Sequence, residues 1–156
     1  MKPRVLVSLC LLGIECRYDG GGNGVGGLEA LRQRCELVPL CPEQLGGLPT
    51  PRSPSERLGD RVVTREGADV TAAFQRGAAQ ACKMAELFGA KYALLKARSP
   101  SCGTGRIYDG AFRGRLTQGN GLTAQALKAM GVQTFDETQI DALICKLEED
   151  DAYDTV

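Results

Sequence analysis

Three apolar segments of this chain each end at a cysteine, and this pattern constrains the fold more than any other feature. The segments are 5–10 (VLVSLC), 37–41 (LVPLC) and 92–102 (YALLKARSPSC). Short apolar runs of this kind are typical of strands buried on both faces of a parallel sheet. Because parallel strands end at the same edge, the three cysteines are predicted to meet where open α/β sheets bind ligands.

Helical patterns separate the apolar runs. Hydrophobic spacing predicts a further strand over 132–135 and helices over 28–35, from 69 or 71 to 88, 122–130 and 138–148. Strands that alternate with helices imply right-handed crossovers. We therefore expect an α/β fold: a single-domain three-layer sandwich with a mainly parallel, Rossmann-like sheet.

The remaining segments are predicted to be short strands, loops and a tail. Residues 61–65 (RVVTR) are expected to add a short edge strand, and 107–121 to form a glycine-punctuated hairpin or lid. The domain is expected to cover 1–150, followed by an acidic tail over 151–156. Residues from Glu148 to Asp154 are expected to be frayed or disordered.

Charge and hydropathy exclude several classes of partner. The 156 residues carry 19 basic and 19 acidic side chains, so the formal net charge is zero. This balance does not indicate an extended basic surface that would bind nucleic acid or an anionic membrane. The apolar runs are also far shorter than the ~20 residues needed to cross a bilayer. We expect no nucleic acid and no membrane as partners, and a small molecule instead.

Cysteine and histidine usage indicates the kind of chemistry. The chain has seven cysteines, no histidine and no recognisable export signal, which favours a cytoplasmic protein with reduced thiols. An odd, histidine-free cysteine set favours thiolate ligation of a soft metal or cluster over a disulfide framework. Acid–base work must then fall to Asp, Glu, Lys, Tyr, Cys or bound water.

Four cysteines lie outside the predicted helices: Cys10, Cys16, Cys41 and Cys102. No pair has the C-x-x-C spacing of a thioredoxin motif or a zinc ribbon. Three thiolates suit an iron–sulfur cluster with one open iron, or a catalytic metal with three protein ligands and an open position. The alternative is that they are ordinary core cysteines, since free cysteine is among the most buried residue types. Of the helical cysteines, Cys35 and Cys82 are expected to pack rather than ligate, and Cys145, which falls off the apolar stripe of its helix, is the weakest candidate for a ligand.

Polar residues near the predicted site are candidates for catalysis. Glu43 lies two residues after Cys41, and Asp19 lies in the loop after the first strand. Either carboxylate can therefore act as a general base. Ser101 can hydrogen-bond a substrate carbonyl or thione. Each has a structural alternative as a cap, a loop ion pair or a turn residue. Arg17, Arg52 and Arg98 can hold an anion, although exposed arginine is more often simply solvated.

A glycine-dense loop over 20–27 (GGGNGVGG) satisfies G-x-G-x-x-G. A dinucleotide fingerprint follows its strand directly, whereas these glycines come some ten residues after theirs. A turn-rich loop is therefore favoured over an anion cradle.

Five blocks occur in order over roughly 5–132: SLCLLGIECRYDGG, LCPEQLGGLPTPR, RVVTREGADVT, LLKARSPSCGTGRIYDGAF and GNGLTA. Together they resemble a small bacterial family of domains of uncharacterised function that includes the thiouracil desulfidases. The resemblance implies an oxygen-sensitive [4Fe-4S] cluster on three cysteines, which match Cys10, Cys41 and Cys102. Cys16 lies where relatives often have a non-ligating residue such as valine, so it is the runner-up ligand.

The same resemblance implies that Glu43 and Ser101 match catalytic and substrate-contacting residues. The implied reaction is non-redox hydrolytic desulfuration, in which the open iron polarises a carbon–sulfur bond and water activated by Glu43 attacks the carbon. A thiolated nucleobase such as 2-thiouracil is the expected substrate, with uracil and sulfide as products and a sulfide acceptor possible. The alternatives are a sulfur-transfer enzyme, or a non-catalytic protein whose metal or cluster is a sensor or structural element.

Overall fold

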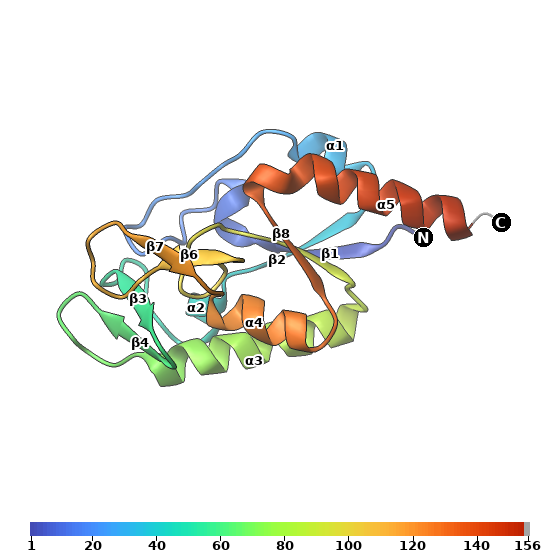
Figure 1. Cartoon of the computed structure of the whole chain (residues 1–156). Helices are drawn as coiled ribbons and strands as arrows, with labels where there is room; N and C mark the ends of the chain where they lie inside the picture. Colours follow the sequence, from blue (N-terminus) through green and yellow to red (C-terminus); the bar gives the residue numbers. More distant parts are fainter. Residues whose placement is uncertain (155–156) are drawn as a thin grey trace.

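A four-stranded parallel sheet in the order β2-β1-β5-β8 forms the centre of the computed structural model, which describes residues 1–154 (Figure 1). Its strands are β1 (Arg4–Ser8), β2 (Glu36–Leu40), β5 (Tyr92–Leu95) and β8 (Gln133–Asp136). β1 pairs with β2 on one side and with β5 on the other, and β5 pairs with β8, always in parallel. The predicted parallel sheet is confirmed, and the three apolar runs are neighbours in it.

Helices cover both faces of the sheet (Figure 1). One face carries α1 (Leu28–Arg32) and α5 (Ile140–Asp154), and the other carries α3 (Thr71–Phe88) and α4 (Leu122–Ala129). Alternation along β1 explains both cores, because successive side chains of a strand point to opposite faces. Val5 and Val7 pack in the cluster that includes residues of α1 and α5, whereas Leu6 packs with alanines and leucines of α3 and α4. The three-layer sandwich is confirmed.

Two hairpins and three short helices lie outside these layers. The hairpins are β3 (Ser55–Leu58) with β4 (Arg61–Thr64), and β6 (Arg106–Tyr108) with β7 (Leu116–Gln118). The short helices are η1 (Leu9–Leu12), α2 (Pro42–Leu45) and η2 (Glu137–Gln139). The predicted hairpin within 107–121 is confirmed. The edge strand predicted at 61–65 is corrected, because β4 pairs with β3 in a separate sheet rather than with the central one.

The strand order reverses at β1, and this reversal locates the site. After β2 on one side of β1, the chain crosses back to β5 on its other side. In such open sheets the crevice beyond the carboxyl ends of the two strands at the reversal is the usual ligand site. Cys10 follows β1 here, but it lies in η1 rather than in the strand, which ends two residues earlier than predicted.

The acidic end of the chain differs from the sequence expectation. Residues predicted to be frayed or disordered from Glu148 continue α5 to Asp154, and residues 155–156 lie outside the described part. Contacts to the body of the domain support this extension. Tyr92 of β5 donates a hydrogen bond to Asp150, and Glu148 forms a 2.9 Å ion pair with Arg34. Among residues 1–154, no helix combines the length and the apolar character of a membrane span.

The Tyr92–Asp150 contact makes a testable prediction about alkaline stability. Burial, followed by the hydrogen bond and charge of Asp150, raises the pKa of Tyr92 to about 12. A raised pKa means that this contribution is fully present below the unfolded value of about 10 and is lost as pH rises through the folded value. Tyr92→Phe is expected to lower the free energy of unfolding by about 1 kcal/mol at pH 7.

Urea unfolding at pH 7 and at several values above pH 10 measures both effects. The variant should lose less stability than the wild type over the alkaline range. Equal losses in the two proteins would show that the Tyr92 hydroxyl does not couple to folding.

Candidate active site

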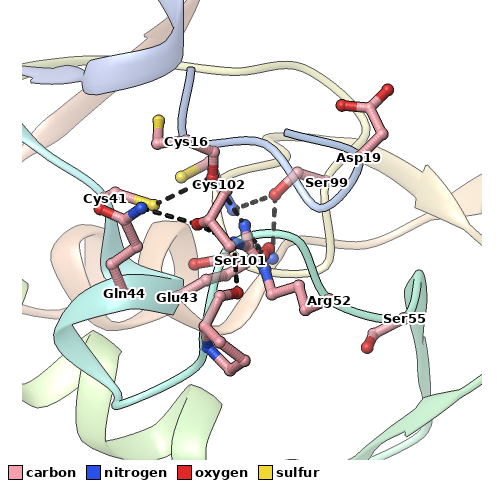
Figure 2. A network of polar contacts seen from close by, with 12 residues as sticks. Cys16, Asp19, Cys41, Glu43, Gln44, Arg52, Ser55, Ser99, Ser101 and Cys102 are labelled. Atoms are coloured by element: carbon pink, nitrogen blue, oxygen red, sulfur yellow. Dashed lines mark hydrogen bonds and ion pairs between the residues drawn. The ribbon is translucent and has the colours of Figure 1, made fainter. Parts of the chain in front are cut away.

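A cavity of about 420 Å³ opens beyond the carboxyl ends of β1, β2 and β5. It is lined by four cysteines, Cys10, Cys16, Cys41 and Cys102, and by Glu43, Arg52 and Ser101. Figure 2 shows Cys16, Cys41 and Cys102 gathered beside Glu43 and Arg52, with Asp19 pointing away from them. The predicted meeting of cysteines at one edge of the sheet is thus present in the fold.

Each of the three strand-end cysteines comes from a different local structure. Cys10 is part of η1, and its carbonyl accepts hydrogen bonds from the amides of Asn23 (2.7 Å) and Gly13 (3.1 Å). Cys41 is the N-cap residue of α2, so Pro42 and Glu43 form the first turn of that helix. Proline is favoured at this position because its missing N–H has no helical partner there anyway.

Cys102 is held by a serine that the sequence reasoning did not single out. The Ser99 hydroxyl accepts hydrogen bonds from the amides of Ser101 (3.1 Å) and Cys102 (2.8 Å). The Ser101 carbonyl then accepts from the amides of Thr123 and Ala124 at the start of α4. A serine that caps amides two and three residues later is a recognised local motif, so S-P-S-C held a usable signal.

The cavity disfavours free thiolates. Burial, together with the neighbouring Cys10, Glu43 and Cys41, raises the pKa of Cys102 to about 12, although a hydrogen bond with Ser8 acts in the opposite direction. Burial followed by the nearby Cys41 and Cys10 likewise raises the pKa of Cys16 to about 12. The pKa of Cys10 is raised as well, chiefly by burial. Cys10, Cys16 and Cys102 therefore ionise readily only beside a positively charged group.

The donor set of the cavity consists of sulfur atoms. Four cysteines line it, and thiolates suit a soft metal or an iron–sulfur cluster. Within residues 1–154, no group of three or more His, Cys, Asp or Glu side chains has the geometry of a single-ion site. A [4Fe-4S] cluster binds each of its cysteines through a different iron. These cysteines can therefore supply the three thiolates of such a cluster.

Glu43 is held rigidly by Arg52. Nε and Nη2 of Arg52 lie 2.6 and 2.5 Å from the same oxygen of Glu43, Oε2. The side chain of Glu43 is only 16% exposed, and that of Arg52 is only 8% exposed. Arg52 also donates to the carbonyls of Cys16 (3.0 Å) and Pro49 (3.2 Å) and to the hydroxyl of Thr50 (3.0 Å). Its charge is thus used to orient Glu43 rather than left free for an anion, and Oε1 is not engaged by Arg52.

The structure places only one of the two other predicted site residues in the cavity lining. Asp19 lies outside it, where it pairs with Arg17 at 3.4 Å and accepts a hydrogen bond from the Gly21 amide. Ser101 lines the cavity as predicted; its side chain is buried, and its hydroxyl shares a 3.1 Å hydrogen bond with Thr123.

The helical cysteines and the glycine loop take no part in this cavity lining, apart from Asn23. Cys35 is buried as expected, Cys82 is half-buried rather than fully buried, and Cys145 is exposed. In the loop over 20–27, the amides of Asn23 and Val25 bond to the carbonyls of Cys10 and Leu11. These amides are therefore committed to packing the loop over η1, which does not support an anion cradle.

A lysine–glutamate pair was missed by the sequence reasoning. Lys96 lines the cavity and pairs with Glu137 at 2.8 Å, while its amide donates to the Ser8 hydroxyl. Glu137 also accepts from the Ala97 amide at 2.6 Å. The two residues are 41 positions apart and come together only because β5 and β8 are adjacent, so no local motif signals them.

Close packing of α2 on α3 leads to a prediction about cluster loading. A Cβ on Gly77 would lie 2.0 Å from the carbonyl oxygen of Pro42, so Gly77→Ala must displace the turn that carries Cys41 and Glu43. This overpacking is expected to lower the free energy of unfolding by about 1–3 kcal/mol and to reduce iron retention. Urea unfolding and iron per chain after anaerobic reconstitution measure the two effects.

Gly26→Ala is the matched control for Gly77→Ala. Its added Cβ meets nothing within 4 Å, and its φ is not in the left-handed region. The control should retain iron as the wild type does. Full retention by Gly77→Ala would mean that α2 can shift without disturbing the cysteines.

Comparisons with known proteins identify relatives of this chain. An uncharacterised protein of Bacillus subtilis strain 168, YbbK, is 39% identical over 150 residues, covering 90% of this chain and 99% of that protein. The solved structure of TudS, a [4Fe-4S]-dependent thiouracil desulfidase, superposes with a TM-score of 0.90 at 47% identity, covering 94% of this chain and 99% of that one. The family model described as 2-thiouracil desulfurase matches residues 5–139. This chain therefore belongs to the 2-thiouracil desulfurase family.

Proposed function

We propose that this protein is a [4Fe-4S]-dependent desulfidase that hydrolyses the carbon–sulfur bond of a thiolated nucleobase such as 2-thiouracil. Water and the thiolated base give uracil and hydrogen sulfide, with no change of oxidation state. The observation that carries the proposal is the placement of Cys10, Cys41 and Cys102 around one cavity that also contains an oriented carboxylate, Glu43. A 47% identical thiouracil desulfidase of the same fold supports it.

Cys10, Cys41 and Cys102 are proposed to hold the cluster. Each follows a different strand of the central sheet, and together they provide three thiolates for four irons. The bound cluster supplies an iron without a protein ligand, which acts as a Lewis acid toward the sulfur of the substrate. Cys16 is buried and its carbonyl is bonded to Arg52, so we propose that it packs beside the site and is not a ligand.

Glu43 is proposed to be the general base. Arg52 holds Oε2, which leaves Oε1 to take a proton from the attacking water. A carboxylate oriented by a bidentate arginine contact loses little freedom when it acts, because its position is already fixed. We assign Ser101 a positioning role through Thr123 and the start of α4, and Asp19 no role in proton transfer.

The proposal also covers the cellular location of the protein, the fate of the sulfide and the binding partners. We propose that the protein acts in the cytoplasm, where cysteines are kept reduced. Sulfide is proposed to leave as free hydrogen sulfide, with transfer to an acceptor as the alternative. A small thiolated heterocycle is the proposed partner, and neither nucleic acid nor a membrane is invoked.

The first prediction of this proposal concerns the cysteines. Anaerobic reconstitution with iron and sulfide should load about four irons per chain, and the loaded protein should release sulfide from 2-thiouracil. Cys10→Ala, Cys41→Ala and Cys102→Ala should each lose both properties, because each removes one ligand. Cys16→Ala should keep both and serves as the matched control.

The same experiment separates the alternatives. A loaded cluster with no sulfide release, and no spectral response to 2-thiouracil, would favour a non-catalytic cluster protein. Uracil formation that requires an added acceptor able to take up sulfur at the sulfide oxidation state, such as a thiophilic metal ion, would favour sulfur transfer. Loss of the cluster in Cys16→Ala would make Cys16 a ligand and close the site to substrate.

The second prediction concerns Glu43. Glu43→Gln preserves the shape of the side chain but removes the base, so kcat for sulfide release should fall about 10²- to 10⁴-fold. The cluster absorption spectrum should remain, which separates loss of the base from loss of the cofactor. Glu29→Gln on the exposed surface of α1 is the matched control and should retain wild-type kcat. A Glu43→Gln variant with wild-type kcat would require a different base.

A further inference from the structure

The loop between β6 and β7 is fixed to the β3 hairpin by a buried carboxylate. Glu56 is only 8% exposed, and its Oε1 accepts hydrogen bonds from the amides of Gly110 (3.0 Å) and Phe112 (3.1 Å). The amide between them, on Ala111, donates to Asp109 Oδ1 at 2.9 Å. Three successive amides are thus bound by carboxylates, so the loop has a defined conformation although it is near the surface.

Phe112 has an unusual backbone conformation. Its φ is +56°, and within residues 1–154 the only other non-glycine residue with positive φ is Arg98, at +69°. For a bulky residue this conformation is strained and costs on the order of 1–3 kcal/mol. Both residues line the cavity that holds the cysteines and Glu43. Backbone strain that occurs only at one cavity indicates that these two side chains are held there for function.

The aromatic ring of Phe112 is a possible stacking surface for a ligand in the cavity. The side chain lines the cavity together with Glu56, Arg65 and Tyr108. The guanidinium carbon of Arg65 lies over the ring, 5.8 Å from its centroid. An aromatic ring in a ligand cavity offers a flat apolar surface on which another planar ring can stack at little entropic cost.

We propose that Phe112 is a specificity-determining residue that stacks on the planar ring of the substrate, and that Glu56 positions it. This inference rests on the proposed function for the identity of the ring. Glu56 acts through the amides of Gly110 and Phe112, which hold the loop in the strained conformation. Substrate selection then comes from two separate parts of the cavity: the cluster side recognises sulfur, and Phe112 recognises the planar ring.

The test is calorimetric titration of uracil into anaerobic, cluster-loaded protein. Uracil lacks sulfur, so its affinity reports contacts with the ring and not with iron. Phe112→Gly removes the ring while keeping a residue that adopts positive φ without strain, so the loop should retain its conformation. Its uracil affinity should fall by about 5- to 150-fold, the range for loss of one stacked base. Phe112→Tyr retains an aromatic ring and should restore most of the affinity.

Two further variants complete the design. Glu56→Gln weakens the charge-assisted bonds to the loop and should raise KM for 2-thiouracil by more than it lowers kcat. Arg113→Ala, an exposed neighbour outside the cavity lining, is the matched control and should bind uracil like the wild type.

The outcomes separate this inference from the proposed function. Wild-type uracil affinity in Phe112→Gly would overturn stacking, as would a loaded wild-type protein that does not bind uracil. Absence of sulfide release from 2-thiouracil in a protein that still shows the Phe112-dependent binding would contradict the proposed reaction and support the ring contact.

Discussion

Parallel pairing of β1 with β2 on one side and with β5 on the other is the constraint on which the rest of this structure depends. It brings the ends of three strands, far apart in sequence, to one crevice at the reversal of strand order. Each strand is followed by a different local structure: η1 after β1, the N-terminus of α2 after β2, and the Ser99-capped loop after β5. The cysteines in these three local structures line the same cavity without any C-x-x-C motif.

Burial of those cysteines links the fold to the chemistry. Thiols that are removed from water and placed near one another resist ionisation, as the raised pKa values of Cys10, Cys16 and Cys102 show. A cationic iron–sulfur cluster core offsets that cost when its ligands become thiolates, so loading of the cluster and stability of this edge are coupled. The same desolvated setting strengthens the interaction between Glu43 and Arg52, because charges attract more strongly where water is excluded.

Hydrogen bonds between loops from distant parts of the chain hold the walls of the cavity in place. Arg52 links the segment after α2 to the carbonyl of Cys16, and Glu56 links β3 to the loop that carries Phe112. The hairpin β3–β4 therefore supports the site although it is not part of the central sheet. In this arrangement the sheet places the proposed cofactor ligands, and the hairpins place the residues proposed to face the substrate ring.

Sequence reasoning predicted the parallel sheet, the main helix ending at Phe88 and the meeting of three strand-end cysteines, because periodicity and apolar runs are local signals. It predicted neither β3 nor the extension of α5 to Asp154. β3 is a short polar strand with little periodicity of its own, and the end of α5 depends on distant partners such as Tyr92 and Arg34.

For the candidate site as well, some features follow from the sequence and others only from the tertiary structure. By itself, the order of cysteines along the chain determined which residues were available as ligands, and Glu43, two residues after Cys41, was a candidate base. Only the tertiary structure decided that Arg52 orients Glu43, that Asp19 lies outside the cavity and that Glu56 holds Phe112. These outcomes depend on distances between side chains from separate elements, and such distances are set by packing rather than by any local pattern of residues.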